Sequence, residues 1–286
     1  MVQPPAAADA RKCVTPAPGG GLRVEVPGLA LGVRSRFSVQ GGGFNTLSPG
    51  GKPEGEPDWR VSITGSGGER VVKAAAREYR LERRVRWAGD HVELADTLTN
   101  LTGADIGLAF DNALVAPEGS VEQAYLGGDP NPSRVRNEGG ENPTLFLQGD
   151  RAGCGLLARD DVYRIQGVIY YAGGGGIRSD TFALPARGSY TVRWALYPVL
   201  RPDYYDFINL ARRDLDVNFT VPGGFLFGLH AVAAEEDAAL RERLGTRGAR
   251  FISSGVWFDR GGEVSCYHGS HMLKAARLRE NQKAWA

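Results

Sequence analysis

Acidic side chains are the first residues in the sequence that could do chemistry. Hydrolysis of a glycosidic bond needs two carboxyl groups about 5 to 9.5 Å apart. Five acids in the middle of the chain could supply such a pair: Asp111, Glu138, Glu141, Asp160 and Asp161. We predict that they lie in loops beside Gly and Asn, where an acid is more often a solvated turn former than a catalyst. The catalytic residues are therefore left unassigned.

A second group could bind a metal ion. His268 and His271 are three positions apart, which places them on one face if the segment is helical, and Cys266 precedes them closely. The sequence shows no further ligand at a spacing typical of a zinc site. Ser270 could instead cap the last predicted helix. We favour this interpretation, and we predict no metal and no cofactor.

Aromatic side chains could stack on the faces of sugar rings. The candidates are the pair Tyr170 and Tyr171 together with five tryptophans. Because Trp59, Trp87 and Trp194 fall on predicted strands, and each buries a large apolar area, we assign most of the tryptophans to the core.

Charged residues near a predicted domain junction are a further candidate. An ion pair within Arg212-Arg213-Asp214 could hold a helix in place or line a substrate cleft, and we favour the structural role. As substrate-binding candidates we nominate residues at or beyond this junction. They are Arg213, Ser254, Trp257 and His268.

Composition limits the possible partners. The chain has 286 residues, with 34 Lys and Arg against 33 Asp and Glu. No overall field attracts a polyanion or a membrane surface, so nucleic acid and membrane are not expected as partners. No apolar run reaches the roughly 18 residues that a membrane span needs. The start of the chain lacks the pattern of a signal peptide. Location is left open, with a secreted or periplasmic protein as the alternatives considered.

Alternation of apolar and polar residues dominates from Leu22 to about residue 200 and predicts half-buried strands. Forty glycines provide many turns, among them Ala88-Gly89-Asp90 in a long hairpin. A series of strands without a convincing helix before residue 203 predicts a mainly β fold, with two stacked antiparallel sheets in a large sandwich. Residues 1–21 contain few large apolar groups and are predicted to be a flexible lead-in.

The pattern changes after Pro198. Residues 203–215 have the spacing of an amphipathic helix, which we predict to be a linker within residues 201–230. A helix over 233–244, a strand over 250–255 and a helix over 268–283 follow. This succession is typical of α/β folds. We expect residues 231–286 to be the first elements of an incomplete α/β domain that resembles a barrel.

One segment carries a family resemblance. Residues 92–108, VELADTLTNLTGADIGL, place a D-T-x-x-N-x-T strand before a turn and a second strand. This segment resembles the galactose mutarotase-like supersandwich domains that precede glycoside-hydrolase-like barrels. Residues 194–214 resemble the exit from such a sandwich into a linker helix. The resemblance implies that the acid and nucleophile of a hydrolase would lie on barrel strands, at their carboxyl ends.

Mutarotase chemistry itself is not expected. The family resemblance implies histidines and a glutamate as acid and base at the sugar. The chain has only four histidines, and we place His91 in a hairpin turn. The other three, His230, His268 and His271, lie at or beyond the end of the predicted sandwich.

The leading hypothesis is a non-catalytic sandwich module of a carbohydrate-active, glycoside-hydrolase-like protein. It would support the barrel and contribute to the cleft for an oligo- or polysaccharide. One alternative is a free-standing carbohydrate-binding module with an exposed aromatic strip. Another is an enzyme of mutarotase or lyase type.

Overall fold

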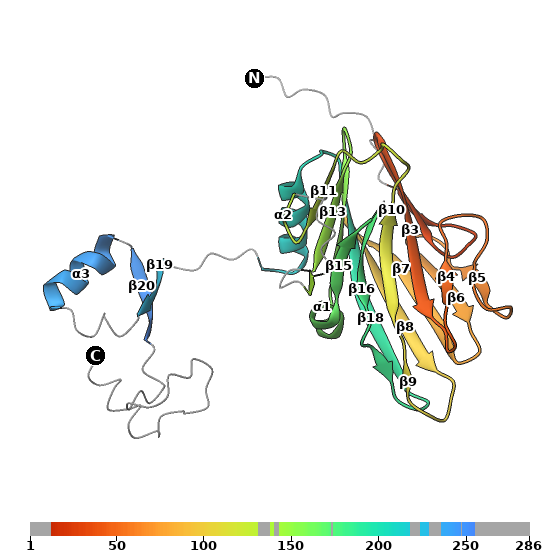
Figure 1. Cartoon of the computed structure of the whole chain (residues 1–286). Coiled ribbons are helices and arrows are strands. Elements are labelled where there is room, and N and C mark those ends of the chain that lie inside the picture. The colour runs from red at the N-terminus through yellow and green to blue at the C-terminus, as the bar shows by residue number, and fades with distance from the viewer. Residues whose placement is uncertain are drawn as a thin grey trace. The chain divides into compact units, whose positions relative to one another are not determined.

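The computed structural model describes residues 13–130, 138–139, 143–172, 174–217, 224–228, 236–246 and 248–254. The chain divides into two compact units, Met1–Val217 and Asn218–Ala286 (Figure 1). The first unit holds a two-sheet antiparallel sandwich, as the alternation predicted.

The first sheet has eight strands. Its path runs through β1 (Cys13–Pro16), β2 (Leu22–Val26), β3 (Leu29–Ser38), β10 (Phe110–Val115), β16 (Gly175–Ser179), β15 (Val168–Tyr171) and β12 (Glu138–Gly139), and β4 (Phe44–Leu47) pairs with β3. Because β1 pairs with β2 along its whole length, the sandwich begins at Cys13 and not at Leu22. The prediction of a flexible lead-in was therefore wrong for residues 13–16.

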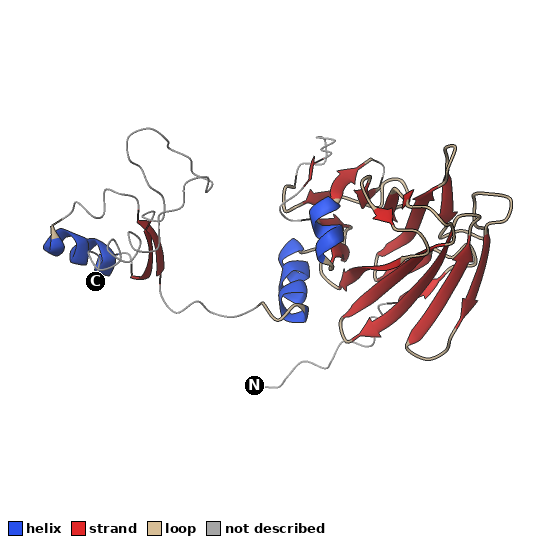
Figure 2. Ribbon diagram, turned by 90° about the horizontal axis from the view of Figure 1, so that it is seen from below, coloured by secondary structure: helices blue, strands red, loops and turns tan. Residues whose placement is uncertain are grey.

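The second sheet also has eight strands. In order they are β11 (Gln123–Leu126), β13 (Thr144–Gln148), β14 (Gly153–Ala158), β18 (Ser189–Val199), β8 (His91–Asn100), β7 (Tyr79–Ala88), β6 (Glu69–Ala75) and β5 (Arg60–Thr64). Two short strands, β9 (Ile106–Gly107) and β17 (Ala183–Leu184), pair separately. The sheets face each other in Figure 2.

Period-two patterning builds the core between the sheets. Along β3 every second residue is buried, from Leu29 to Phe37, and β7 and β8 follow the same rule from Tyr79 and Val92. The apolar residues among them belong to one hydrophobic cluster, and the polar ones include the buried Arg83 and Asp96. The predicted hairpin is present, because Ala88 pairs with His91 across Gly89-Asp90 and Gly89 has a φ of 66°.

Helix α2 (Tyr204–Asp214) covers part of the outer face of the second sheet. The Asp203 side chain caps it by accepting from the Tyr205 amide at 2.8 Å, and basic residues close its last turn. Phe207 and Ala211, one turn apart, are buried against Phe146 and Tyr197. Burial of a phenylalanine contributes about 1.5–3 kcal/mol. The helix predicted as a linker thus packs within the first unit.

Two expectations about the sandwich were wrong. Residues 161–166 form a short helix, α1 (Asp161–Gln166), although the sequence indicated no helix before residue 203, and the Asp160 side chain caps it at 3.0 Å from the Tyr163 amide. Trp59 precedes β5 and does not lie on it, although it is buried as predicted. Trp194 is fully buried, and Trp87 is partly buried against the same core.

In the second unit the structure describes three elements. They are β19 (Gly224–Gly228), α3 (Asp237–Thr246) and β20 (Ala249–Ser254). The two strands are parallel, with Gly228 opposite Ser254 at their carboxyl ends. A strand, a helix and a parallel strand form a β-α-β unit. The predicted helix over 268–283 lies outside the described residues.

Candidate functional site

A buried carboxylate lies on the outer face of the first sheet. Along β10, Phe110, Asn112 and Leu114 face the core, so Asp111 points to the opposite face. The strand register places Arg36 of β3 and Arg178 of β16 directly opposite Asp111 on either side. Asp111 is only 2% exposed. The prediction of a solvated loop acid was therefore wrong for Asp111.

Two side chains satisfy this carboxylate. Arg36 donates to Oδ2 from Nε at 2.9 Å and approaches it with Nη2 at 2.7 Å. The Tyr170 hydroxyl of β15 donates to Oδ1 at 2.5 Å. Such charge-assisted bonds are short and strong. Asp111 therefore fixes the positions of a guanidinium and a phenol whose outer atoms stay near the surface, and we call Arg34, Arg36, Asp111 and Tyr170 the Asp111 cluster.

The cluster keeps its phenol protonated. Burial is the main cause that raises the pKa of Tyr170, and the charge of Asp111 raises it further, while Arg36 and Arg34 act in the opposite direction. For Arg36, burial lowers the pKa, but the charge and hydrogen bond of Asp111 outweigh it and raise the pKa overall. At neutral pH Arg36 is thus a cation and Tyr170 carries a neutral hydroxyl.

Arg34 completes the cluster one row further along the sheet. The register aligns Arg34 with Ala113, Gly176 and Tyr170 on successive strands, so the two residues between the large side chains are small. The Arg34 Nε atom is buried and has no hydrogen-bond partner in the part of the chain that the structure describes. A buried N–H group without a partner is costly, which makes this atom a candidate donor for a ligand.

A buried polar network lies directly behind the cluster and joins the two sheets. Arg83 of β7 is fully buried and donates to both oxygens of Asp96 at 2.7 Å. Its Nη2 also reaches Ser35 at 2.8 Å and Asn112 at 3.2 Å, the sequence neighbours of Arg36 and Asp111. Because Ser35 and Asn112 belong to the first sheet, the network fixes the strands that carry the Asp111 cluster.

A third group of ionisable residues lies where α2 meets the second sheet. The metal-ligating atoms of His91, Glu93 and Asp214 lie within 4.8 Å of one another. Arg159 already contacts Glu93 at 3.0 Å and Asp214 at 3.2 Å, and the Tyr197 hydroxyl donates to Asp214 at 2.5 Å. With donors on both carboxylates, the arrangement is a junction that holds the end of α2.

His91 differs from its predicted place. It is the first residue of β8, is 8% exposed and stacks on the Tyr197 ring, with 5.2 Å between ring centroids. Its Nε2 lies 3.0 Å from Asp214 Oδ1. The predicted position in the hairpin turn is corrected by one residue, because His91 is the first strand residue after the turn. The favoured structural role of the Arg212-Arg213-Asp214 segment agrees with the contacts of Asp214.

The nominated substrate-binding residues are divided between the two units and the part of the chain outside the described residues. Arg213 is exposed on α2, and Ser254 is the last residue of β20 in the other unit. Trp257 and His268 lie outside the described residues, as do Glu141, His230, His271 and Cys266. Asp160 and Asp161 begin α1, and Glu138 lies on β12.

Sequence reasoning missed the Asp111 cluster because its members are far apart in the chain. Arg36 and Asp111 are separated by 75 positions, and Asp111 and Tyr170 by 59. One signal was present: Arg34 and Arg36 alternate with the apolar residues of a clear strand. Two arginines on the outer face of one strand indicate a charged surface but not its partner.

The fold and this cluster define the first unit as a two-layer antiparallel β-sandwich with a guanidinium, carboxylate and phenol site on one outer face. No protein-family model and no curated protein sequence matches the chain. In the described residues, no helix is both long enough and apolar enough to cross a membrane.

Solved structures similar to the chain include galactose mutarotase-like proteins, the group that residues 92–108 resemble. A putative aldose 1-epimerase from Klebsiella pneumoniae has 9% identity and a TM-score of 0.43, over 72% of this chain and 80% of that one. A galactose mutarotase-like protein from Clostridium acetobutylicum has 11% identity and a TM-score of 0.36, over 65% and 91%. A polysaccharide lyase has 12% identity and a TM-score of 0.41, over 76% and 36%. Likenesses this distant assign no activity.

Proposed function

We propose that the first unit is a sugar-binding sandwich module of a carbohydrate-active protein and that the Asp111 cluster contacts the sugar. The observation that carries the proposal is the Arg34 side chain, whose Nε atom is buried and has no hydrogen-bond partner among the described residues. It lies on the same outer face as a tyrosine held in place by a buried carboxylate.

The chemistry of the cluster suits a sugar hydroxyl. A hydroxyl group donates one hydrogen bond and accepts others. The guanidinium of the partly buried Arg34 supplies N–H donors, and the Tyr170 oxygen, whose proton is committed to Asp111, retains lone pairs that can accept. A donor and an acceptor on one face can therefore serve one hydroxyl or two adjacent ones. The aromatic ring of Tyr170 adds an apolar surface for a sugar ring.

Sugar binding by the full chain tests this proposal. We expect a panel of oligosaccharides, titrated by calorimetry, to include a ligand whose affinity falls about tenfold in Tyr170→Phe and in Arg34→Gln, since each loses one bond to a charged or polar group. Tyr171→Phe is the matched control, because Tyr171 is the next residue and packs against the core. Binding that survives both cluster variants, or that falls equally in the control, would reject the site.

We further propose that residues 218–286 begin an α/β barrel that the sandwich supports. The support is the parallel β19–α3–β20 unit, with Ser254 at a carboxyl strand end, where barrel sites gather. Strand and helix repeats encoded in the gene beyond codon 286 would agree with this assignment. A stop codon at that point would contradict it.

A second candidate function is proton transfer at the same cluster. It is favoured by the Tyr170 hydroxyl, which is held 2.5 Å from Asp111 and whose pKa is raised by burial, so that it is a neutral proton donor. Turnover of sugars or uronates by the full chain, lost in Tyr170→Phe but kept in Tyr171→Phe, is the expected result. Sugar binding without turnover would contradict proton transfer and agree with the sugar-binding role only.

A further inference from the structure

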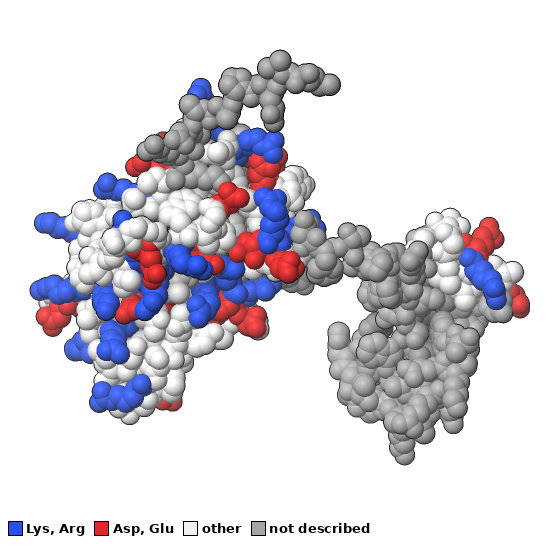
Figure 3. Space-filling model, turned by 180° about the vertical axis from the view of Figure 1, so that it is seen from behind, with Lys and Arg blue, Asp and Glu red and all other residues white. Residues whose placement is uncertain are grey.

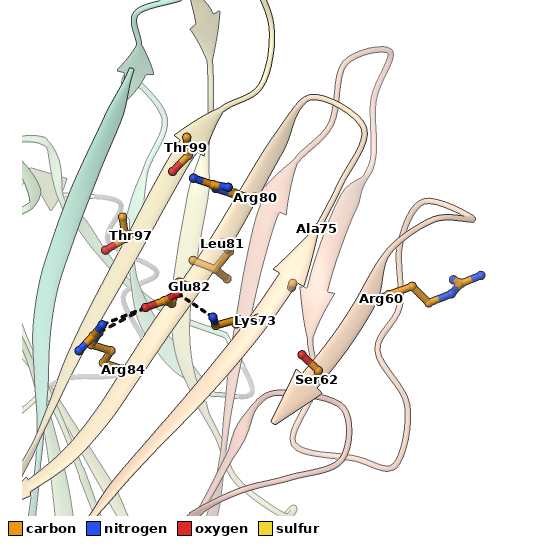
Figure 4. A pocket seen from close by; sticks show the side chains of 11 residues that line it. Arg60, Ser62, Lys73, Ala75, Arg80, Leu81, Glu82, Arg84, Thr97 and Thr99 are labelled. Atoms are coloured by element: carbon orange, nitrogen blue, oxygen red, sulfur yellow. Dashed lines mark hydrogen bonds and ion pairs between the residues drawn. The ribbon is translucent and has the colours of Figure 1, made fainter. Parts of the chain in front are cut away.

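The outer face of the second sheet carries a basic groove that the Asp111 cluster does not explain. The groove has a volume of about 500 Å³ and is formed by β5, β6, β7 and β8 (Figure 4). Its charged side chains are Arg60, Lys73, Arg80, Glu82 and Arg84. On the face of the sandwich seen in Figure 3, basic side chains gather with acidic ones between them.

The strand register arranges these side chains in rows across the sheet. In one row Arg60 and Arg80 flank Ala75, and Thr99 follows on β8. In the next row Ser62, Lys73, Glu82 and Thr97 are neighbours. Adjacent strands lie about 4.8 Å apart, so Arg60 and Arg80 stand about 10 Å apart at their backbones. The cations are thus spread along the groove and do not converge on one point.

Two of the four cations in the groove are paired within the protein, and two are not. Glu82 is the one carboxylate among the lining residues, and it pairs with Lys73 at 3.3 Å and Arg84 at 3.2 Å; Arg84 also lies 3.7 Å from Glu69. Within the described part of the chain, Arg60 and Arg80 have no ion-pair partner, and both are exposed. Four cations against one carboxylate leave a local excess of positive charge, although the whole chain has a formal net charge of only +1. Such a groove attracts an anionic ligand.

The remaining groups of the groove indicate the kind of anion. Hydroxyls of Ser62, Thr97 and Thr99 line it, and no aromatic side chain does. Single-stranded nucleic acids are bound largely by stacking of bases on aromatic rings, which this groove cannot provide. Hydroxyls beside separated cations suit a polymer that has its own hydroxyls and a charge at intervals. Three of the four cations are arginines, whose planar fork matches a carboxylate.

We infer that this groove binds an extended polysaccharide that carries uronate carboxylates. The surface lies on a different sheet from the Asp111 cluster, so the inference does not depend on that site. Guanidinium groups of Arg60 and Arg80 would pair with successive carboxylates, and the threonine hydroxyls would meet those of the sugars. Because the pairs are exposed, salt screens them, and binding weakens as ionic strength rises.

The test uses the full chain and alginate, measured by biolayer interferometry at low and at physiological salt. We expect Arg60→Gln/Arg80→Gln to weaken binding about tenfold or more, since two charge-assisted contacts are lost. The matched control is Arg23→Gln/Arg164→Gln, which removes the same charge from β2 and α1, outside the groove. Ala75→Glu, at an exposed position between the two arginines, should also weaken binding.

Each outcome decides the inference. Equal losses in the groove variant and the control, or unchanged binding in the groove variant, would overturn it. Tighter binding of dextran sulfate, which carries no uronate, or of single-stranded DNA than of alginate would overturn the uronate assignment, and equal binding of neutral dextran would overturn the role of charge. Alginate binding that persists in Tyr170→Phe supports an independent surface. Failure of the Asp111 cluster and failure of the groove are therefore distinguishable.

Discussion

Arg83 shows what a single charged side chain can do inside a sandwich. Its guanidinium pairs with Asp96 and lies over the Trp194 ring, 5.1 Å from the ring centroid. Arg83 is the register partner of Asp96 within the second sheet, and because both are buried, loss of either one would leave an unpaired buried charge. Through Ser35 and Asn112 it also holds the strands of the Asp111 cluster.

We predict that Arg83→Met destabilises the protein by about 3–5 kcal/mol, because it leaves Asp96 as an uncompensated buried charge. Urea unfolding followed by circular dichroism measures the change. The double variant Arg83→Met/Asp96→Leu removes both charges and should recover part of the loss. A double variant less stable than the single one would show that the pair itself, and not the orphaned charge, supplies the stability.

At the Asp111 cluster we predict that Asp111→Asn lowers the pKa of Tyr170. The carboxylate charge disfavours ionisation of the phenol, so its removal makes tyrosinate easier to form, although burial still keeps the pKa above the ordinary value. NMR titration of labelled tyrosine rings measures the shift, and Tyr171 is the internal reference. An unchanged pKa at Tyr170 would mean that burial alone sets it.

Elements meet closely where glycines allow it. Helix α2 packs over β14 at Gly155, where an added Cβ atom would lie 2.2 Å from the Phe207 ring. The close approach explains why this strand, otherwise apolar, has a glycine under the helix. Gly176 plays a similar part in the first sheet, because a Cβ atom there would lie 2.4 Å from the Asn112 carbonyl oxygen.

We predict that Gly155→Ala destabilises the protein by about 1–3 kcal/mol, because the extra methyl group displaces Phe207 or the backbone of α2. Thermal unfolding by calorimetry measures the loss. Gly107→Ala is the control: it makes the same change on a strand residue where the new Cβ atom meets nothing within 4 Å. Equal effects at the two positions would argue against packing under α2 as the cause.

The junction between α2 and the sheet should respond to acid. Burial, the largest influence, raises the pKa of Glu93, but hydrogen bonds and charges from Arg86 and Arg159 outweigh it and lower the pKa overall. A lowered folded-state pKa means that Glu93 contributes stability above its unfolded pKa of about 4.3, and that this contribution is lost as pH falls through the folded value.

We therefore predict that Glu93→Gln reduces the loss of stability between about pH 5 and pH 3, compared with the unaltered protein. Urea midpoints across this range measure the effect. Glu118→Gln, an exposed acid in a loop, makes the same charge change away from the junction. A pH profile of Glu93→Gln that parallels that of the unaltered protein would refute the assignment.

The sequence predicted the strands in which apolar and polar residues alternate, and it missed elements without this alternation. Strands β3, β7 and β8 have clean period-two patterns and were found. Strand β16 does not show this alternation, because it begins with Gly175 and Gly176, which are typical of turns, although here glycine is needed where strands crowd. Helix α1 was missed because six residues are too few to show a helical period. The Asp111 cluster depends on strand order, which alternation does not specify.

At the scale of the molecule, near-neutral composition conceals an uneven distribution of charge. The sequence excluded a polyanion from a formal net charge of +1, yet the structure gathers four cations and one carboxylate in a single groove. Net charge describes the field far from the protein, and a ligand in contact with a sheet responds to the nearest few residues.

We predict that a chain ending at Val217 folds alone and keeps the thermal midpoint of the sandwich within a few degrees. Both large sheets, their shared core and the packing of α2 are formed by residues before this point. Calorimetry of the shortened and full chains measures this. A midpoint lower by about 5 °C or more, equivalent to about 2 kcal/mol or more, would mean that residues 218–286 stabilise the sandwich.

Strand β5 ends the second sheet, and its outward backbone groups have no neighbouring strand within the sheet order. Arg60 is the only charged residue of β5, and Ile63 of the same strand is 37% exposed. Charges at such margins discourage two molecules from joining strand to strand. The Arg60 guanidinium, which would contact a polyanion, thus also opposes self-association at the edge of β5. A bound polymer should shield this edge. A neutral residue at position 60 should promote self-association.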